Sequence, residues 1–186
     1  MQRLTDEQLI EFFSSNKDGK GQAALSYLYN RYAKQMLNFF YFTLNNDYNK
    51  AQDFVHDLFL KVIEKHTSLR NNQPFKPWIY KIASNMCKNE FRDREVIQKY
   101  NNHIIYTSDP LILYDDSEKT LRLCISELNR DERSLIVLRF KLKLTVKEIA
   151  DIYDCAEGTI KSRLFHTTKK LSTLYKTYDH ESISKC

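Results

Sequence analysis

The stretch TVKEIADIYDCAEGTIKSRLFHTTKKL, residues 145–171, decides how this chain folds. Its apolar residues recur at helical spacing on both sides of a short break at residues 154–156, which predicts two short helices joined by a tight turn. Thr145 is followed three residues later by Glu148, the capping-box pattern that opens a helix. The stretch is therefore expected to form a small bihelical unit.

The second of these two helices has two contrasting faces. A bihelical unit whose second helix is basic has the size and the chemistry to enter the major groove of DNA. The alternative is an ordinary helical hairpin with a solvated basic face, and the agreement of charge, size and turn favours DNA reading. The apolar face carries Ile160, Leu164 and Leu171, and the polar face carries Lys161, Ser162, Arg163, His166, Lys169 and Lys170.

The composition favours a globular, all-helical chain. Of its 186 residues 42% are hydrophobic and 28% are charged, and three glycines and three prolines leave few helix breakers. A net charge of +5 mildly favours a polyanionic partner. The four cysteines are far apart and match no zinc-binding spacing, and no apolar run resembles a signal peptide or a membrane span. We therefore expect a cytoplasmic protein without a metal or a cofactor.

The N-terminal half reads as a series of amphipathic helices. A helix start is expected at Thr5, and longer helices are expected over residues 22–44 and 50–66. The outer ridge of the 50–66 helix is mixed, acidic and apolar. This ridge suits docking against a basic helical partner, although plain solvated surface is slightly favoured by the sequence. It consists of Asp53, His56, Asp57 and Leu60.

A polar loop over residues 67–76 precedes the next expected helix, which has Pro77 at its first position. Trp78, Ile79 and Ala83 belong to its apolar stripe. Amides and positive charges on the opposite side suit single-stranded or melted nucleic acid, and a solvated helix face is an equally good reading. This opposite side includes Tyr80, Lys81, Asn85, Lys88 and Arg92.

These segments predict an all-α fold, with two small helical domains joined by a linker. The N-terminal domain is expected over residues 1–95 and an acidic, irregular linker over 96–118. Residues 119–175 would form a four-helix unit whose last two helices are the helix-turn-helix, and a flexible polar tail would occupy 176–186. Two basic helical units on one chain suggest that the protein binds nucleic acid at two sites.

At this stage the chain resembles the bacterial RNA polymerase sigma factors of the extracytoplasmic-function (ECF) group in the sigma-70 family. The resemblance covers about residues 20–172 and rests on three stretches in the right order. The first, AQDFVHDLFLKVIEK, is similar to the family's D-L-V-Q-E-V-F-L helix, which docks on the β′ clamp helices of the polymerase. Asp53 matches that motif, Asp57 replaces the usual Glu, and His56 replaces the usual Gln.

The second stretch, PFKPWIYKIASNMCKNEFRDR, is similar to the family's F-x-x-W-L-x-x-I-A-x-N pattern. In that family this helix and the loop before it hold the melted −10 promoter element, with one base flipped out of the stack, which requires a pocket with stacking and edge contacts. The resemblance implies that Trp78 packs beneath that pocket. It assigns the −10 contacts to Asn71, Asn72 and Phe75 around the pocket and to Lys81, Asn85, Lys88 and Arg92 on the helix.

The third stretch is residues 145–171, similar to the family's E-I-A and G-T-V-K-S-R-L motifs, whose second helix reads the −35 element. Ser162, Arg163 and His166 are then candidates for base edges, and Lys161, Lys169 and Lys170 for phosphates. Asp154 stands where the turn commonly has Gly. Ala156 replaces the usual capping Ser, which should lose about 1 kcal/mol that Glu157 partly offsets through the helix dipole.

The resemblance implies a sigma factor that binds core RNA polymerase, recognises −10 and −35 elements, and performs no covalent chemistry. Its expected partners are the polymerase core, through the β′ clamp helices and the β flap, promoter DNA, and an anti-sigma factor of the kind typical for the family. The alternative is a stand-alone helix-turn-helix regulator with an N-terminal dimerisation or sensor domain. An enzyme is disfavoured because the sequence has no Gly-rich phosphate loop and no catalytic pairing of its five histidines.

Overall fold

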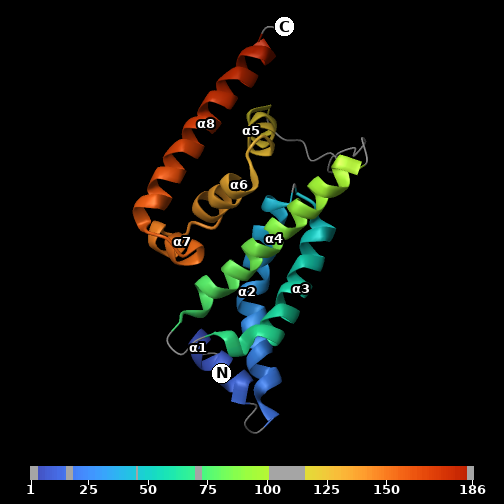
Figure 1. The fold of residues 1–186 in the computed structure, drawn as a ribbon, viewed down its shortest axis with the longest axis vertical. Helices are drawn as coiled ribbons and strands as arrows, with labels where there is room; N and C mark the ends of the chain where they lie inside the picture. Colours follow the sequence, from blue (N-terminus) through green and yellow to red (C-terminus); the bar gives the residue numbers. More distant parts are fainter. Residues whose placement is uncertain (1–3, 16–18, 45, 70–72, 101–115, 184–186) are drawn as a thin grey trace. The chain divides into compact units, whose positions relative to one another are not determined.

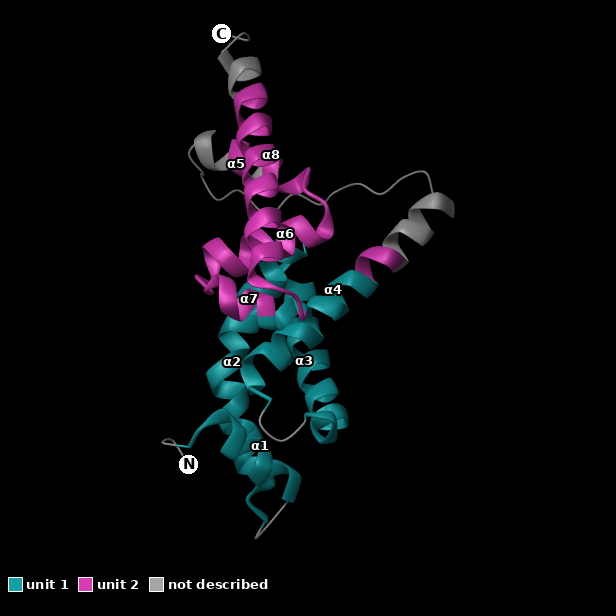
Figure 2. Cartoon of the chain, turned by 60° about the vertical axis from the view of Figure 1, so that its left-hand side comes forward, with its two compact units in different colours: residues 1–89, 151–153 teal, residues 90–150, 154–186 magenta. Residues whose placement is uncertain are grey.

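The computed structural model describes residues 4–15, 19–44, 46–69, 73–100 and 116–183, with side chains at 93–100, 116–119, 122 and 179–183 left out of the description. Throughout these ranges the regular structure is helical and no strand occurs, so the predicted all-α fold is confirmed. The chain divides into two compact units (Figure 2). The first is Met1–Asn89 with Asp151–Tyr153, and the second is Glu90–Ala150 with Asp154–Cys186.

The first unit is built on α1 (Asp6–Ser15), α2 (Gly21–Thr43), α3 (Tyr48–Lys65), the short 3₁₀ turn η2 (His66–Ser68) and the start of α4 (Phe75–Tyr100). α2 packs against both α1 and α3, and α1 lies at the end of the bundle where α3 stops and α4 begins (Figure 1). The expected apolar stripes form the core. Its fully buried side chains include Leu28, Met36, Phe39, Phe40, Leu58 and Ile79.

The start of α4 differs from the prediction. The helix begins at Phe75, so Pro77 lies at its third residue and not its first. The first-turn N–H groups of a helix have no partner within the helix, so a proline is tolerated throughout that turn. Tyr80 was expected on the polar side but is fully buried, with its hydroxyl donating to Gln35 Oε1 at 3.2 Å.

The second unit contains α5 (Asp116–Ser126), α6 (Arg130–Ile136), a π-helical segment (Val137–Lys141), α8 (Glu157–Ile183) and α7 (Val146–Tyr153) up to Ala150. The predicted capping box is present, with Thr145 accepting from the Glu148 N–H and Glu148 accepting from the Thr145 N–H. Asn129 and Glu132 form a second capping box at α6. Arg133 is buried, and its Nη2 donates to the Ser126 carbonyl at 2.8 Å.

Helices extend past two of the expected boundaries. α8 continues to Ile183, through most of the expected tail, because no glycine or proline follows Gly158 to end it. α4 reaches Tyr100 and α5 begins at Asp116, so helix extends into both ends of the expected linker. Residues 101–115, which carry most of that linker, lie outside the described residues. In the described part of the chain no helix is both long and apolar enough to cross a membrane.

Candidate nucleic-acid interface

The turn between α7 and α8 depends on a left-handed residue. Asp154 adopts φ 53° and ψ 52°, and the N–H of Cys155 donates to the Ala150 carbonyl at 3.1 Å. A short polar side chain tolerates this conformation better than most residues do, so the turn forms without the usual glycine. Ala156 precedes α8, and its carbonyl accepts from Thr159 at 2.9 Å, but its side chain has no oxygen for the free N–H groups of the first turn.

The polar face predicted for α8 is exposed, as DNA reading requires. Ile160 and Thr167 are buried, which fixes the rotation of the helix and turns the opposite side to solvent. Lys161 approaches Glu157 at 4.0 Å within the same helix, an exposed pair of little energetic weight. The exposed set matches the predicted base-edge and phosphate candidates: Lys161, Ser162, Arg163, His166, Lys169 and Lys170.

One member of this set has a partner that the sequence did not reveal. Lys170 Nζ lies 2.8 Å from Glu132 Oε2, the carboxylate that also accepts the Asn129 N–H in the capping box of α6. Partial burial alone would raise the pKa of Glu132, but the bonds from Lys170 and Asn129 and the Lys170 charge hold it below its ordinary value. Lys170 therefore ties α8 to α6, and its expected role in phosphate binding competes with this contact.

Phe165 was missed as a candidate. Its side chain is 63% exposed, and its ring meets the His166 ring edge-on at 5.5 Å. A signal was available, because Phe165 follows Ser162 by three residues and precedes Lys169 by four, so helical spacing places it among the polar candidates. An apolar ring at such a position can contact the methyl group of thymine.

The second candidate surface lies on α4. Asn85 and Arg92 are exposed there, and Lys81 and Lys88 are half-buried. Phe75, which was expected to shape a surface pocket, is instead fully buried, with its ring 5.4 Å from Tyr32 and 5.7 Å from Trp78. It therefore belongs to the core of the first unit and exposes no side-chain surface here. Asn71 and Asn72 lie outside the described residues.

The third candidate surface is the outer ridge of α3. Asp53, His56 and Asp57 are exposed, and Leu60 is 57% exposed. Asp47 caps this helix by accepting the Lys50 N–H at 3.0 Å, and buried Val55 and Leu58 fix the opposite face to the core. An exposed apolar side chain beside two carboxylates is suited to a partner that combines basic and apolar groups.

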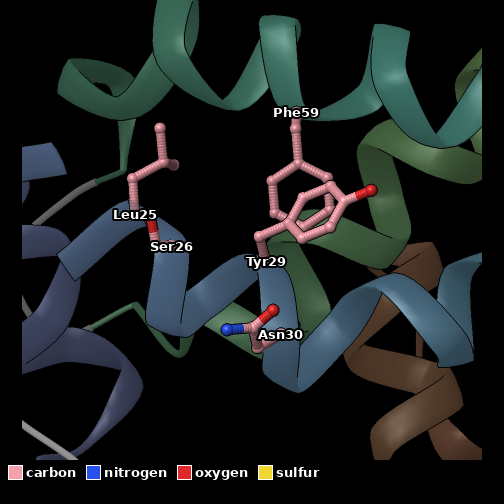
Figure 3. A pocket seen from close by; sticks show the side chains of 5 residues that line it. All are labelled: Leu25, Ser26, Tyr29, Asn30 and Phe59. Carbon is pink, nitrogen blue, oxygen red and sulfur yellow. The ribbon is translucent and has the colours of Figure 1, made fainter. Parts of the chain in front are cut away.

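A pocket between α2 and α3 is lined by Leu25, Ser26, Tyr29, Asn30 and Phe59 (Figure 3), a set without carboxylate, imidazole, thiol or amine groups. The Tyr29 and Phe59 rings lie 4.7 Å apart at this pocket. In the described parts of the chain, no group of three or more His, Cys, Asp and Glu side chains is placed to hold a metal ion.

Comparison with known proteins identifies the family. The family model for Sigma-70 region 2 matches residues 15–96, and the model for Sigma-70 region 4 matches residues 124–173. The chain belongs to the sigma-70 family. These two matches include the α3 ridge and the α4 surface in region 2, and the exposed face of α8 in region 4.

Relatives of this sigma-70 family protein include members of the ECF group. It is 26% identical to the ECF RNA polymerase sigma-E factor of Haemophilus influenzae over 185 residues, covering 91% of this chain and 95% of the relative. It is 27% identical to the sigma-E factor of Escherichia coli K12 over 188 residues, covering 91% and 94%. It is 27% identical to the RNA polymerase sigma-H factor of Pseudomonas aeruginosa over 143 residues, covering 68% and 73%.

Solved structures agree with this fold. The sigma factor RpoE, crystallised with the anti-sigma factor NepR from Bartonella quintana, has a TM-score of 0.59 at 26% identity, covering 75% of this chain and 89% of that chain. CnrH, solved with the cytosolic domain of CnrY, has a TM-score of 0.67 at 18% identity, covering 92% and 97%. The second likeness shows the fold alone.

Proposed function

We infer that this protein is an ECF sigma factor that binds core RNA polymerase and directs promoter-specific initiation of transcription. The observation that carries this conclusion is the presence of region 2 and region 4 in order on one chain, with an ECF sigma factor matched over 91% of this chain and 95% of that relative. A stand-alone helix-turn-helix regulator is not favoured, because such a protein has no need of a region 2 with an exposed ridge beside a nucleic-acid surface.

The region 4 part, residues 119–175, would read the −35 element with α8. Ser162, Arg163 and His166 are exposed and would meet base edges, where a bidentate Arg on guanine is the commonest specific contact. Lys161 and Lys169 would bind phosphates and set the register. Phe165 would add a contact to a thymine methyl group. This assignment is supported by the exposure of these side chains and by the burial of the opposite face of α8.

The region 2 part, residues 1–95, would hold the melted −10 element. Asn85 and Arg92 are exposed on α4, and Lys81 and Lys88 add positive charge along the same helix. Single-stranded nucleic acid binds such a basic and amide-lined surface with strong dependence on salt. Asn71 and Asn72 would shape the capture pocket for the flipped base. Phe75 supports this surface from the core and is not part of it.

The α3 ridge would dock on the β′ clamp helices of the polymerase. Its three polar members, Asp53, His56 and Asp57, precede the exposed Leu60 on the same helix, so a basic surface with an adjoining apolar residue would pair with it. The region 4 part would meet the β flap. An inhibitory partner of the anti-sigma class is proposed by analogy with the RpoE–NepR complex. The protein would act where the polymerase acts, in the cytoplasm, and would catalyse no covalent step itself.

The test is complex formation with core polymerase, followed by transcription from a randomised promoter pool. We expect co-elution in gel filtration and polymerase-dependent transcripts from a selected subset of promoters. Leu60→Asp should abolish co-elution, whereas Glu64→Ala, at an exposed carboxylate on the same helix, serves as the matched control. Absence of a complex for the wild-type chain, with sequence-specific duplex binding by the chain alone, would favour the regulator instead.

A further inference from the structure

Helix α1 lies almost entirely before the part of the chain matched by the region 2 family model, which begins at residue 15. It nevertheless contacts α4. Glu7 Oε1 accepts the backbone N–H of Phe75, the first residue of α4, at 3.3 Å. A first-turn N–H has no partner within its own helix, so this carboxylate satisfies a group that would otherwise be left to solvent. Glu7 thus caps α4 from a helix far away in the sequence.

The same helix also contacts the other end of the α3–α4 connection. The Phe13 ring meets the His66 ring edge-on, with centroids 4.9 Å apart and an interplanar angle of 71°. His66 opens η2 directly after α3, and its Nδ1 lies 2.6 Å from the Ile63 carbonyl, which fixes the imidazole against the end of α3. α1 therefore touches the chain both where it leaves α3 and where it enters α4.

α1 is itself firmly held against α2. Leu9 and Ile10 are buried, and Asp6 pairs with Arg31 and accepts the Tyr32 hydroxyl. Arg31 Nη2 also donates to the Leu4 carbonyl at 3.1 Å. Because α1 is anchored to α2, the contacts made by Glu7 and Phe13 tie the end of α3 and the start of α4 to the same helix.

We propose that α1 is a positioning brace that holds the end of α3 and the start of α4 and thereby tunes how strictly the −10 element is read. Phe75 opens the helix that carries Lys81 and Asn85, assigned above to the −10 element, so the inference rests on the proposed function. An unpaired base is selected by close contacts, and the geometry of those contacts depends on where the helix that carries them is held. Glu7 and Phe13 touch no DNA in this scheme and act through the two helix ends they contact.

The electrostatics of Glu7 fit this role. Partial burial alone would raise the pKa of Glu7, but hydrogen bonds from the Glu7 and Phe75 N–H groups and from the Thr5 hydroxyl, with the Arg31 charge nearby, lower it below the ordinary value. Glu7 is therefore ionised at neutral pH, and a charged acceptor makes the stronger cap.

The experiment measures −10 discrimination by holoenzyme on promoters that the wild-type holoenzyme recovers from the randomised pool. Discrimination is the ratio of open-complex yield on a recovered promoter to the yield on the same promoter with its most strongly selected −10 base replaced. Glu7→Ala and Phe13→Ala should each lower this ratio by roughly three- to tenfold, the size expected for losing one such contact. Glu7→Gln, which keeps an acceptor oxygen for the Phe75 N–H, should restore most of it. Glu11→Ala, at an exposed carboxylate on the same helix, is the matched control and should leave it unchanged.

Co-elution with core polymerase and the thermal midpoint are measured for every variant, so that loss of fold is separated from loss of discrimination. A ratio equal to wild type in both Glu7→Ala and Phe13→Ala would overturn the brace. An equal loss in Glu7→Gln and Glu7→Ala would also overturn it, because the acceptor would then be irrelevant. Failure of the wild-type chain to support any transcription would instead count against the proposed function.

Discussion

Lys170 Nζ donates to Glu132 Oε2 at 2.8 Å, which joins the middle of α8 to the capping box of α6. The Lys170 side chain is 42% exposed and that of Glu132 23%, so the pair is partly protected from solvent. A lysine held by a carboxylate is less available to a phosphate. The contact therefore separates Lys170 from Lys169, its exposed neighbour on the same helix.

Lys169→Ala and Lys170→Ala should differ in the salt dependence of −35 DNA binding. Lys169→Ala removes one phosphate contact, so the slope of log K against log salt should flatten by about one unit. Lys170→Ala should leave the slope unchanged and lower the free energy of unfolding by about 0.5 kcal/mol, as for a partly exposed ion pair. Binding titrations at several salt concentrations provide the measurement. A flattened slope for Lys170→Ala would show that Lys170 leaves Glu132 for DNA.

Arg163→Ala should relax discrimination at one −35 position by about 1–3 kcal/mol, if Arg163 reads a guanine through a bidentate contact. The measurement compares holoenzyme affinity for the recovered −35 element with affinity for elements substituted base by base. Lys161→Ala is the control, expected to weaken all sequences about equally. A uniform loss for Arg163→Ala would reassign this side chain to the phosphate backbone.

Phe165→Ala should remove a preference for thymine. The exposed ring offers an apolar surface to the C5 methyl group, and thymine and uracil differ only by that group. Wild-type protein should therefore lose affinity when one −35 thymine is replaced by uracil, and Phe165→Ala should lose none on the same change. Equal sensitivity of the two proteins would place the methyl contact elsewhere.

Lys143→Gly should stabilise the protein by about 0.5–1 kcal/mol. Lys143 adopts φ 56°, a left-handed conformation in which the Cβ atom is crowded, and glycine has no Cβ atom. The turn itself should persist, because Leu144 donates to the Leu138 carbonyl at 3.0 Å and accepts from Arg139 Nη1 at 2.8 Å. Lys147→Gly within α7 makes the same replacement at a helical position and should cost about 1 kcal/mol. Denaturant unfolding compares the two, and a loss of stability in both would mean that Lys143 is unstrained.

Stability should fall as the solution is acidified below about pH 4.5, the ordinary pKa of a glutamate. Glu7 and Glu132 have folded-state pKa values below that value, so the unfolded chain takes up protons first and the stabilisation is lost as pH drops through the folded pKa values. Glu132→Gln should flatten the acid limb of the free energy of unfolding against pH. An unchanged acid limb would mean that other carboxylates govern it.

Local rules predicted much of this fold correctly. The Thr145–Glu148 capping box and the tight turn that starts at Asp154 follow from residue type and spacing within a few positions, and both are present. Helical periodicity also placed Ser162, Arg163 and their neighbours on an exposed face. These features depend on contacts between residues close in sequence, which is why sequence alone indicates them.

The features that sequence missed depend on distant partners. By local pattern, Tyr80 belongs to the polar side of its helix and Phe75 to the loop before it. Both instead pack against α2, Tyr80 on Phe39 and Phe75 on Tyr32. The contacts Glu7–Phe75 and Lys170–Glu132 join residues 68 and 38 positions apart, and no periodicity reveals such pairs. The polar composition of residues 176–186 predicts fraying, but α8 continues to Ile183 because this segment contains no helix breaker.

The most direct test is the set of promoters that the holoenzyme recovers from a randomised pool by in vitro transcription. If the protein recognises both a −35 and a −10 element, the recovered promoters should share two separated blocks of selected sequence at a fixed spacing. Arg163→Ala should alter only the upstream block, and Asn85→Ala should alter only the downstream block. A single selected block, or transcripts that are equally abundant without this protein, would contradict its role as a sigma factor.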